Sequence, residues 1–312
     1  MPETATPDTA IIVDSACSLP KTVCDKYNIA FAPLAFNVGG KTTIDQCNDN
    51  NALKLFASNQ FSRKYKVFTT APTVKDFERA IAKKLKQGYK QVIVQTVNRT
   101  QGDTYVNANA AVARLSEHIA GKGISLKVMD SRTVFAGQGL MAIETIRRLA
   151  QESNYDKTRR KMNKLSEKIH TFIIPKSPLI ALERSRERNE NNVGWGQAML
   201  ANTLGIHPII CNANDSSQAV GKVWGFEKAV SILFDHTRSR IDAGLYSPIV
   251  TISYAGPLST LQALPGFTTL HQHAAKKKVR LVCSVASLAA GIYTSVGSLS
   301  LAMATDEHQW TG

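Results

Sequence analysis

The chain has 312 residues, of which 43% are hydrophobic and 20% are charged. This length suits two domains of ordinary size, and the apolar content excludes a disordered or collagen-like chain. The formal net charge of +14 is divided equally between the two halves of the chain, and it is compatible with nucleic acid, an acidic membrane surface or solubility alone.

The first half of the sequence predicts strands that alternate with helices. Residues 1–9 contain two acids and no apolar run, so we expect a disordered N-terminus there and no signal peptide. Strands are expected at residues 10–13, 29–38, 41–44, 91–97 and 126–129, and helices at 20–27, 51–58, 74–87, 103–120 and 137–151. Such alternation is typical of a mostly parallel sheet with helices on both faces.

The second half predicts a similar arrangement. Helices are expected at residues 157–169, 177–188, 196–203, 226–243 and 257–264, with another before Lys276; strands are expected at 170–174, 207–211, 220–223, 249–254 and 279–285. Residues 189–192 form a predicted polar loop. We therefore expect two α/β domains, residues 10–155 and residues 156–305, with mostly parallel sheets.

Residues 281–305 contain no charged side chain and are long enough to cross a bilayer. Many of them are Ser, Thr, Gly or Ala, so the stretch divides better into a strand at 279–285, a Gly- and Ser-rich loop and a small-residue segment. We predict no transmembrane segment.

The cysteines are odd in number and include no Cys-x-x-Cys pair, which argues against a disulfide framework or a zinc ribbon. They are Cys17, Cys24, Cys47, Cys211 and Cys283. Reduced thiols of this kind favour a cytoplasmic location.

The densest basic run lies on the helix predicted at residues 157–169. It consists of Lys157, Arg159, Arg160, Lys161, Lys164 and Lys168. The pattern favours a solvated helix face. Because no aromatic side chains are interleaved with these cations and no zinc-finger spacing is present, binding to nucleic acid is a minor alternative.

Small hydroxyl residues follow several of the predicted strands. They are found at Asp14-Ser15, Thr69-Thr70, Thr96 and Thr100, and Asp130-Ser131. Ligands of open α/β sheets collect at such strand ends, where hydroxyls and free amides can bind an anionic head group. Each residue taken alone is also an ordinary helix cap, but the set indicates an anion-binding crevice.

Motifs for catalysis or for a cofactor are incomplete. Gly137-Gln138-Gly139 and Gly194-Trp195-Gly196 lack the spacing of a dinucleotide or phosphate loop, and no Gly-x-Ser-x-Gly elbow is present. His271 and His273 have no convincing carboxylate partner for a metal. We predict no cofactor, no metal and no catalytic residues.

Several segments together, in order, resemble the DegV family. They are Ile11-Ile12-Val13-Asp14-Ser15, Thr69-Thr70-Ala71-Pro72-Thr73, Thr104-Tyr105, Val128-Met129-Asp130-Ser131-Arg132, Gly137-Gln138-Gly139-Leu140, Gly205-Ile206-His207-Pro208-Ile209, Val220-Gly221-Lys222-Val223 and residues 291–297. The resemblance covers roughly residues 10 to 303.

The resemblance implies a two-domain α/β protein that binds a long-chain fatty acid in a cleft between its domains. The carboxylate lies at the domain junction, and the acyl chain lies in an apolar tunnel. Such a protein is not an enzyme by itself, although some members present the fatty acid to a separate fatty acid kinase subunit. The residues expected to contact the head group are Thr69, Thr70, Gly102, Asp103, Thr104, Tyr293 and Thr294, and weaker candidates for the tunnel are Phe36, Phe68, Val97 and Met141.

The sequence departs from the family pattern at several of these positions. Gly102 replaces the usual serine, and Tyr293 replaces a histidine. Trp224 and Phe226 stand where arginines associated with a kinase partner are usual, and residues 191–193 replace a segment with a further arginine. The chain is therefore expected to be a divergent member.

Two other functions follow from the residues alone. Asp14, Asp103 and Asp130 could hold Mg²⁺ for metal-assisted phosphate transfer. The basic helix at residues 157–169 could bind nucleic acid or an anionic membrane.

Overall fold

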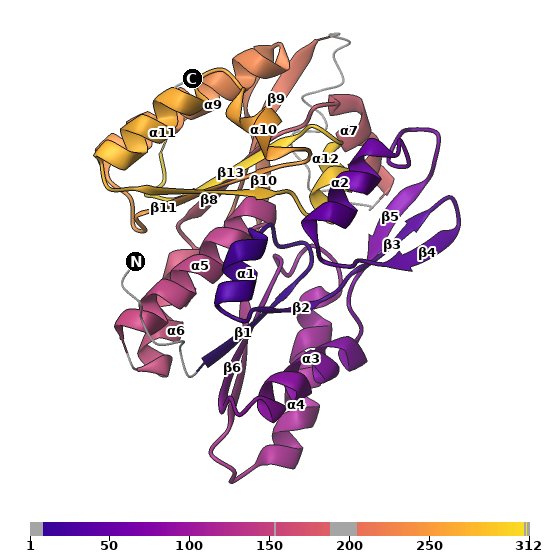
Figure 1. Cartoon of the computed structure of the whole chain (residues 1–312), viewed down its shortest axis with the longest axis vertical. Helices are drawn as coiled ribbons and strands as arrows, with labels where there is room; N and C mark the ends of the chain where they lie inside the picture. Colours follow the sequence, from indigo (N-terminus) through magenta and orange to yellow (C-terminus); the bar gives the residue numbers. More distant parts are fainter. Residues whose placement is uncertain (1–8, 153, 188–204, 309, 311–312) are drawn as a thin grey trace.

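The computed structural model describes residues 9–152, 154–187, 205–308 and 310 (Figure 1). Residues 1–8, the predicted loop at 189–192, the predicted helix at 196–203, the Gly194-Trp195-Gly196 motif and the departure at 191–193 lie outside the described residues. The expected disorder is wrong for Thr9, which is buried at the start of the first strand and donates a hydrogen bond of 2.8 Å to Gln91 Oε1.

Sheet A is the parallel sheet predicted for the first half. Its strand order is β2-β1-β6-β7, formed by β1 (Thr9–Asp14), β2 (Ala30–Ala32), β6 (Gln91–Thr96) and β7 (Ser125–Asp130). One face packs on α3 (Val74–Lys86) and α4 (Thr104–Ile119), and the other on α1 (Lys21–Lys26) and α5 (Phe135–Gln151). Because successive side chains of a strand point to opposite faces, Ile12 packs with Phe77 of α3, while Ile11 packs with Leu140 of α5.

Sheet B is a small antiparallel sheet beside the first. Its order is β4-β3-β5, with β3 (Ala35–Val38), β4 (Lys41–Ile44) and β5 (Val67–Thr70). The single extended segment predicted at residues 29–38 is therefore wrong, because β2 and β3 belong to different sheets. The break falls at Pro33 and Leu34, where proline cannot donate a ladder hydrogen bond. Helix α2 (Asp49–Ala57) follows sheet B's first hairpin.

Sheet C has six strands in the order β10-β9-β8-β13-β11-β12. They are β8 (Ile169–Ile174), β9 (Ile206–Ala213), β10 (Ser216–Trp224), β11 (Ile249–Tyr254), β12 (Arg280–Val285) and β13 (Leu299–Ala304). Only β11 and β12 pair in parallel among the described strands of this sheet, so the expectation of a mostly parallel sheet is wrong here. The physical reason is the short turn at Asn214 and Asp215, whose positive φ angles suit a tight hairpin, together with β13, which inserts between β8 and β11.

The outer face of sheet C packs on helices. They are α9 (Phe226–Ala243), α10 (Leu258–Gln262) and α11 (Phe267–Lys276). The segment at residues 281–305 is divided among β12, α12 (Leu288–Thr294) and β13, so its middle part is a helix and not the expected loop. None of the described helices is both long enough and apolar enough to cross a membrane.

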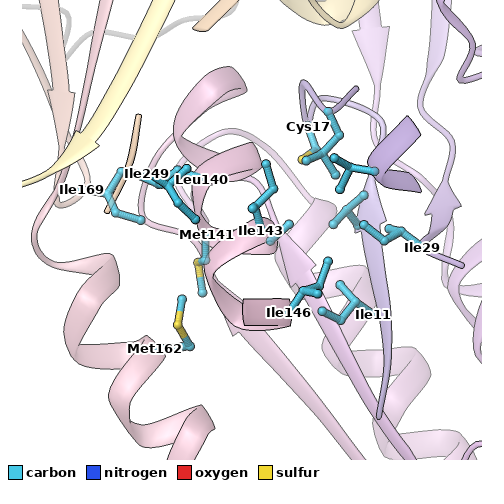
Figure 2. Packing of buried hydrophobic residues seen from close by; sticks show 14 of the residues in the cluster. Ile11, Cys17, Ile29, Leu140, Met141, Ile143, Ile146, Met162, Ile169 and Ile249 are labelled. Atoms are coloured by element: carbon cyan, nitrogen blue, oxygen red, sulfur yellow. The ribbon is translucent and has the colours of Figure 1, made fainter. Parts of the chain in front are cut away.

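Helix α5 lies between sheet A and sheet C and joins them into one packed unit (Figure 1). Residues 135–146 are all buried. Figure 2 shows Leu140, Met141, Ile143 and Ile146 of this helix between side chains of both sheets. The helix can approach so closely because it carries glycines: a Cβ on Gly137 would lie 2.1 Å from Thr171 Oγ1, and a Cβ on Gly139 would lie 2.3 Å from the Ser18 carbonyl oxygen.

The predicted two-domain α/β architecture is thus confirmed, with sheet A and sheet C on opposite sides of α5. The expected limit between residues 155 and 156 falls in the first turn of α6 (Tyr155–Ser166), which packs on α5 and on β7. Helix α6 ends earlier than expected because β8 begins at Ile169. Helix α7 (Pro178–Glu187) follows β8 and packs against α12.

Candidate functional site

A cavity of about 420 Å³ lies where the N-terminal half of the chain meets α7 and α12. Its wall is formed by β5, by the loop before α4, by the loop before α5, and by side chains of α7 and α12. Eight of the residues predicted for the site line it: Phe68, Thr69, Thr70, Val97, Gly102, Asp103, Thr104 and Tyr293. The structure therefore brings together residues that are up to 225 positions apart in the sequence.

Thr69 and Tyr293 are in direct contact at the wall of this cavity. The Tyr293 hydroxyl accepts a hydrogen bond of 2.9 Å from the Thr69 backbone N–H, and it lies 2.9 Å from Thr69 Oγ1. Thr69 is on β5 and Tyr293 is on α12, so the contact joins two elements from opposite ends of the chain. The Thr69 amide is thus engaged by Tyr293, and the two hydroxyls gathered at this point of the wall can rotate to donate to a ligand carboxylate.

The N-terminus of α4 forms another part of the wall. Gly102 has a φ of +87°, which suits glycine, and it leads through Asp103 into the first helical residue, Thr104. Thr104 is 2% exposed. Because the first amides of a helix carry partial positive charge, this end of α4 favours an anionic group, whereas the carboxylate of Asp103 opposes one.

Arg184 is a wall residue that the sequence analysis did not identify. It is on α7, is only 4% exposed, and donates hydrogen bonds to the carbonyl oxygens of Val67 (3.1 Å) and Tyr65 (3.0 Å). Its guanidinium also pairs with Glu187 at 3.3 Å. The sequence did contain an indication of this role: Arg184 lies three residues after the buried Ala181, so the predicted helix places both on its buried face. The arginine attaches α7 to the start of β5 and brings a cation to the cavity.

Three predicted site residues do not line this cavity. Thr294 lines a smaller neighbouring cavity, and its hydroxyl donates to the Ala290 carbonyl oxygen at 2.7 Å. Phe36 is buried in a cluster with Phe61, at a ring-centroid distance of 6.2 Å. Met141 is fully buried within the core around α5 (Figure 2). Phe36 and Met141 are thus core side chains, because their strand and helix faces point into packed layers.

Asp14 holds three segments together beneath the cavity. Its carboxylate accepts hydrogen bonds from the backbone N–H of Val97 (2.6 Å), the backbone N–H of Ala16 (3.0 Å) and the side chain of Gln138 (3.0 Å). Complete burial outweighs these bonds and raises the pKa of Asp14 to about 6. The residue therefore positions the β1, β6 and α5 segments.

The alternative of metal-assisted phosphate transfer is not supported by the geometry. The Asp14 carboxylate already accepts three hydrogen bonds. Asp130 pairs with Arg99 at 3.0 Å and accepts a hydrogen bond from the Arg132 backbone N–H. Within the part of the chain that the structure describes, no three His, Cys, Asp or Glu side chains gather in a way that could hold a metal ion.

The basic helix is partly neutralised by neighbouring acids. Lys157 and Lys161 both pair with Glu152, and Arg159 pairs with Asp156. Lys168, beyond the end of α6, pairs with Asp306. These pairs favour the interpretation of α6 as a solvated helix face.

The two positions expected to carry arginines in the family have different environments. Trp224 is 67% exposed at the end of β10, and Phe226 is buried at the start of α9. Neither side chain supplies a cation.

A parallel sheet and a mixed sheet on either side of a shared helix, with a cavity where the two parts meet, define a class of two-domain α/β proteins. Within that class, the chain belongs to the DegV family: the family model, described as "Uncharacterised protein, DegV family", matches residues 8–306. This confirms the resemblance stated from the sequence.

Similar proteins agree with this assignment. A DegV domain-containing protein of Xanthomonas campestris pv. campestris is 28% identical over 309 residues, covering 96% of this chain and 98% of the relative. Among solved structures, a stearic acid-binding protein from Eubacterium ventriosum has a TM-score of 0.77 at 16% identity, with 95% and 98% of the two chains covered. A DegV lipid-binding protein from Thermotoga maritima has a TM-score of 0.76 at 18% identity, with 96% and 99% covered.

Proposed function

We propose that this protein binds a long-chain fatty acid, with the carboxylate at Thr69, Thr70, Thr104 and Tyr293 and the acyl chain inside the cavity. The observation that carries the proposal is the pair of adjoining hydroxyls of Thr69 and Tyr293 in the wall of a cavity with apolar side chains. Phe68 and Val97 belong to the same wall and suit an acyl chain.

The chemistry of the wall matches the two ends of such a ligand. A carboxylate that leaves water needs hydrogen-bond donors, and hydroxyls supply them without a second negative charge. Each methylene that leaves water contributes about 0.8 kcal/mol, offset by the ordering of the chain on binding. The N-terminus of α4 adds a favourable field for the carboxylate, whereas the guanidinium of Arg184 is already paired with Glu187, which lines the same cavity.

The similar structures support the same ligand class. One is described as a stearic acid-binding protein and another as a DegV lipid-binding protein, and both cover nearly the whole of this chain. We therefore assign the proposed ligand to the cavity beside Thr69 and Tyr293.

The proposed role is binding without chemistry of its own. Besides donors and apolar side chains, the cavity wall carries two carboxylates: Asp103, and Glu187, which pairs with Arg184. The titratable Asp14 is engaged in holding the fold. A role as the acyl-presenting subunit of a fatty acid kinase would need a docking surface other than one built on arginines at positions 224 and 226. The five cysteines are free thiols, which fits a cytoplasmic location.

Lipid extraction of the purified protein followed by mass spectrometry tests the proposal. We expect a co-purified fatty acid, and uptake of added palmitate or oleate by the delipidated protein. Thr69→Val should weaken uptake, while Thr43→Val, on β4 of the same sheet and outside the cavity wall, should not. The absence of any bound or added fatty acid would contradict the proposed function.

A further inference from the structure

A smaller cavity of about 80 Å³ lies beside the main cavity, on the other side of Tyr293. The two cavities share four wall residues: Gln101, Val134, Phe135 and Tyr293. The rest of the smaller cavity comes from α7, β8, β9 and β10, and includes the apolar side chains of Ile173 and Ile210. Because Tyr293 contacts Thr69 and lines both cavities, an acyl chain that passes Tyr293 would enter this space.

One group in this wall is out of place for a purely hydrocarbon ligand. Asn212, on β9, is 2% exposed, and its Nδ2 donates a hydrogen bond of 2.7 Å to Ser217 Oγ on β10. Its Oδ1 is buried and has no hydrogen-bond partner among the described residues. A buried amide oxygen without a partner is costly, and because Asn212 lines the cavity, a ligand group that pairs with this oxygen would offset the cost.

We propose that the ligand of this site is a fatty acid with a hydroxyl group on its chain, and that the hydroxyl pairs with the amide of Asn212. The inference rests on the proposed function and specifies its ligand class. A hydroxyl donates and accepts, so it pairs with the amide in either orientation of the side chain. A carbonyl or a second carboxylate only accepts, and a charged group would lose its hydration among Ile173, Ile210 and Phe135.

The polar neighbours of Asn212 are consistent with this assignment. Ser217, which accepts from Asn212, and Ser185 of α7 also line the smaller cavity. The hydroxyl of Thr294 is already bonded to the Ala290 carbonyl oxygen. The smaller cavity thus combines an apolar lining with neutral hydrogen-bonding groups, which suits a neutral polar substituent.

Competition binding on the delipidated wild-type protein tests the inference with matched ligand pairs. The pairs are stearate with 12-hydroxystearate and palmitate with 16-hydroxypalmitate, which place the hydroxyl in the middle and at the end of the chain. We expect the hydroxylated acid of at least one pair to bind roughly tenfold more tightly than its parent. Asn212→Leu should remove that preference and retain the parent acid. Asn109→Leu, an exposed change on α4 outside both cavity walls, should leave the preference intact.

The outcomes separate this inference from the proposed function. Equal binding within both pairs overturns the hydroxyl assignment, while the binding of either parent acid keeps the proposed function. A hydroxyl preference that persists in Asn212→Leu also overturns the assignment, because another group would then be the partner. If no acid binds, the proposed function itself fails. The wild-type comparison needs no variant, so a folding defect in Asn212→Leu does not remove the test.

Discussion

Arg132 and Asp215 connect the two halves of the protein: Arg132 Nη1 lies 3.4 Å from Asp215 Oδ2. Arg132 follows β7 of sheet A, and Asp215 is at the tip of the hairpin between β9 and β10 of sheet C. Asn214 also accepts from Arg132, at 3.0 Å, and Arg99 pairs with Asp215 at 3.3 Å. The hairpin that carries Asn212 and Ser217 is thus attached at its tip to the first half of the chain.

Removal of this attachment should loosen the hairpin more than it destabilises the fold. We expect Asp215→Ala to lower the free energy of unfolding by at most about 1 kcal/mol, because the pair is partly exposed to solvent. The dissociation rate of a bound fatty acid should increase, since Ser217 at the smaller cavity is two residues from the tip. Stopped-flow release and urea unfolding measure the two effects. A slower release than in the wild type would contradict the prediction.

Loss of the Tyr293 hydroxyl should weaken ligand binding and leave the fold intact. Tyr293→Phe keeps the ring in place but removes the oxygen that contacts Thr69. We expect the affinity for palmitate to fall roughly tenfold, the effect of one lost hydrogen bond to a charged group. Titration with a fluorescent fatty acid checks this. Tyr65→Phe, an exposed tyrosine outside the main cavity wall, is the matched control and should bind normally.

Gly139 should tolerate no side chain, because helix α5 packs directly on a backbone carbonyl. A Cβ at this position would lie 2.3 Å from the Ser18 carbonyl oxygen, and a backbone atom cannot rotate away as a side chain can. We expect Gly139→Ala to reduce the free energy of unfolding by about 3 kcal/mol or to prevent folding. Chemical denaturation and soluble yield measure the effect. Wild-type stability in this variant would mean that α5 is not held so closely.

Stability should depend on the protonation of Asp14. Its folded-state pKa of about 6 exceeds its ordinary value of 3.8, so the folded state binds more protons than the unfolded state between these values. Relative to Asp14→Asn, the wild type should therefore lose stability as the pH rises from about 4 to about 6, by up to about 3 kcal/mol, and then stay level. Urea unfolding of both proteins at a series of pH values gives the difference. A difference that is constant over this range would contradict the raised pKa.

The expected order of elements agrees closely with the structure where local signals are strong. Helix α9 occupies the predicted residues 226–243, and Thr73 caps α3 through a capping box with Asp76. Such signals depend on neighbours in sequence, and hydrophobic periodicity reports them well. The pairing of strands in sheet C could not be predicted in this way. Strand β13 inserts between β8 and β11, and no local pattern in residues 299–304 predicts which strands pair with it.

The residues of the candidate site were likewise predictable from the sequence only in part. Thr69, Thr104 and Tyr293 were predicted as members of one site through the family resemblance, and the structure brings them to one cavity. Phe36 and Met141 were expected there as well, but whether a buried apolar side chain faces a cavity or a packed layer depends on the elements around it. Arg184 was missed because its role arises from the carbonyl oxygens of β5 and its preceding loop, which lie far away in sequence.

The sequence by itself determined that this chain forms two α/β halves, and it indicated the family and the hydroxyl residues at the strand ends. It also predicted no transmembrane segment, and none of the described helices is suited to cross a membrane. Periodicity, caps and ordered motifs are local, so they can be read along the chain. Only the tertiary structure decided that sheet C is mixed, that the Thr69 amide meets the Tyr293 hydroxyl, and that the Asn212 oxygen is buried with no partner in the described part of the chain. These features depend on contacts between distant segments, whose geometry is set when α5 packs between the two sheets.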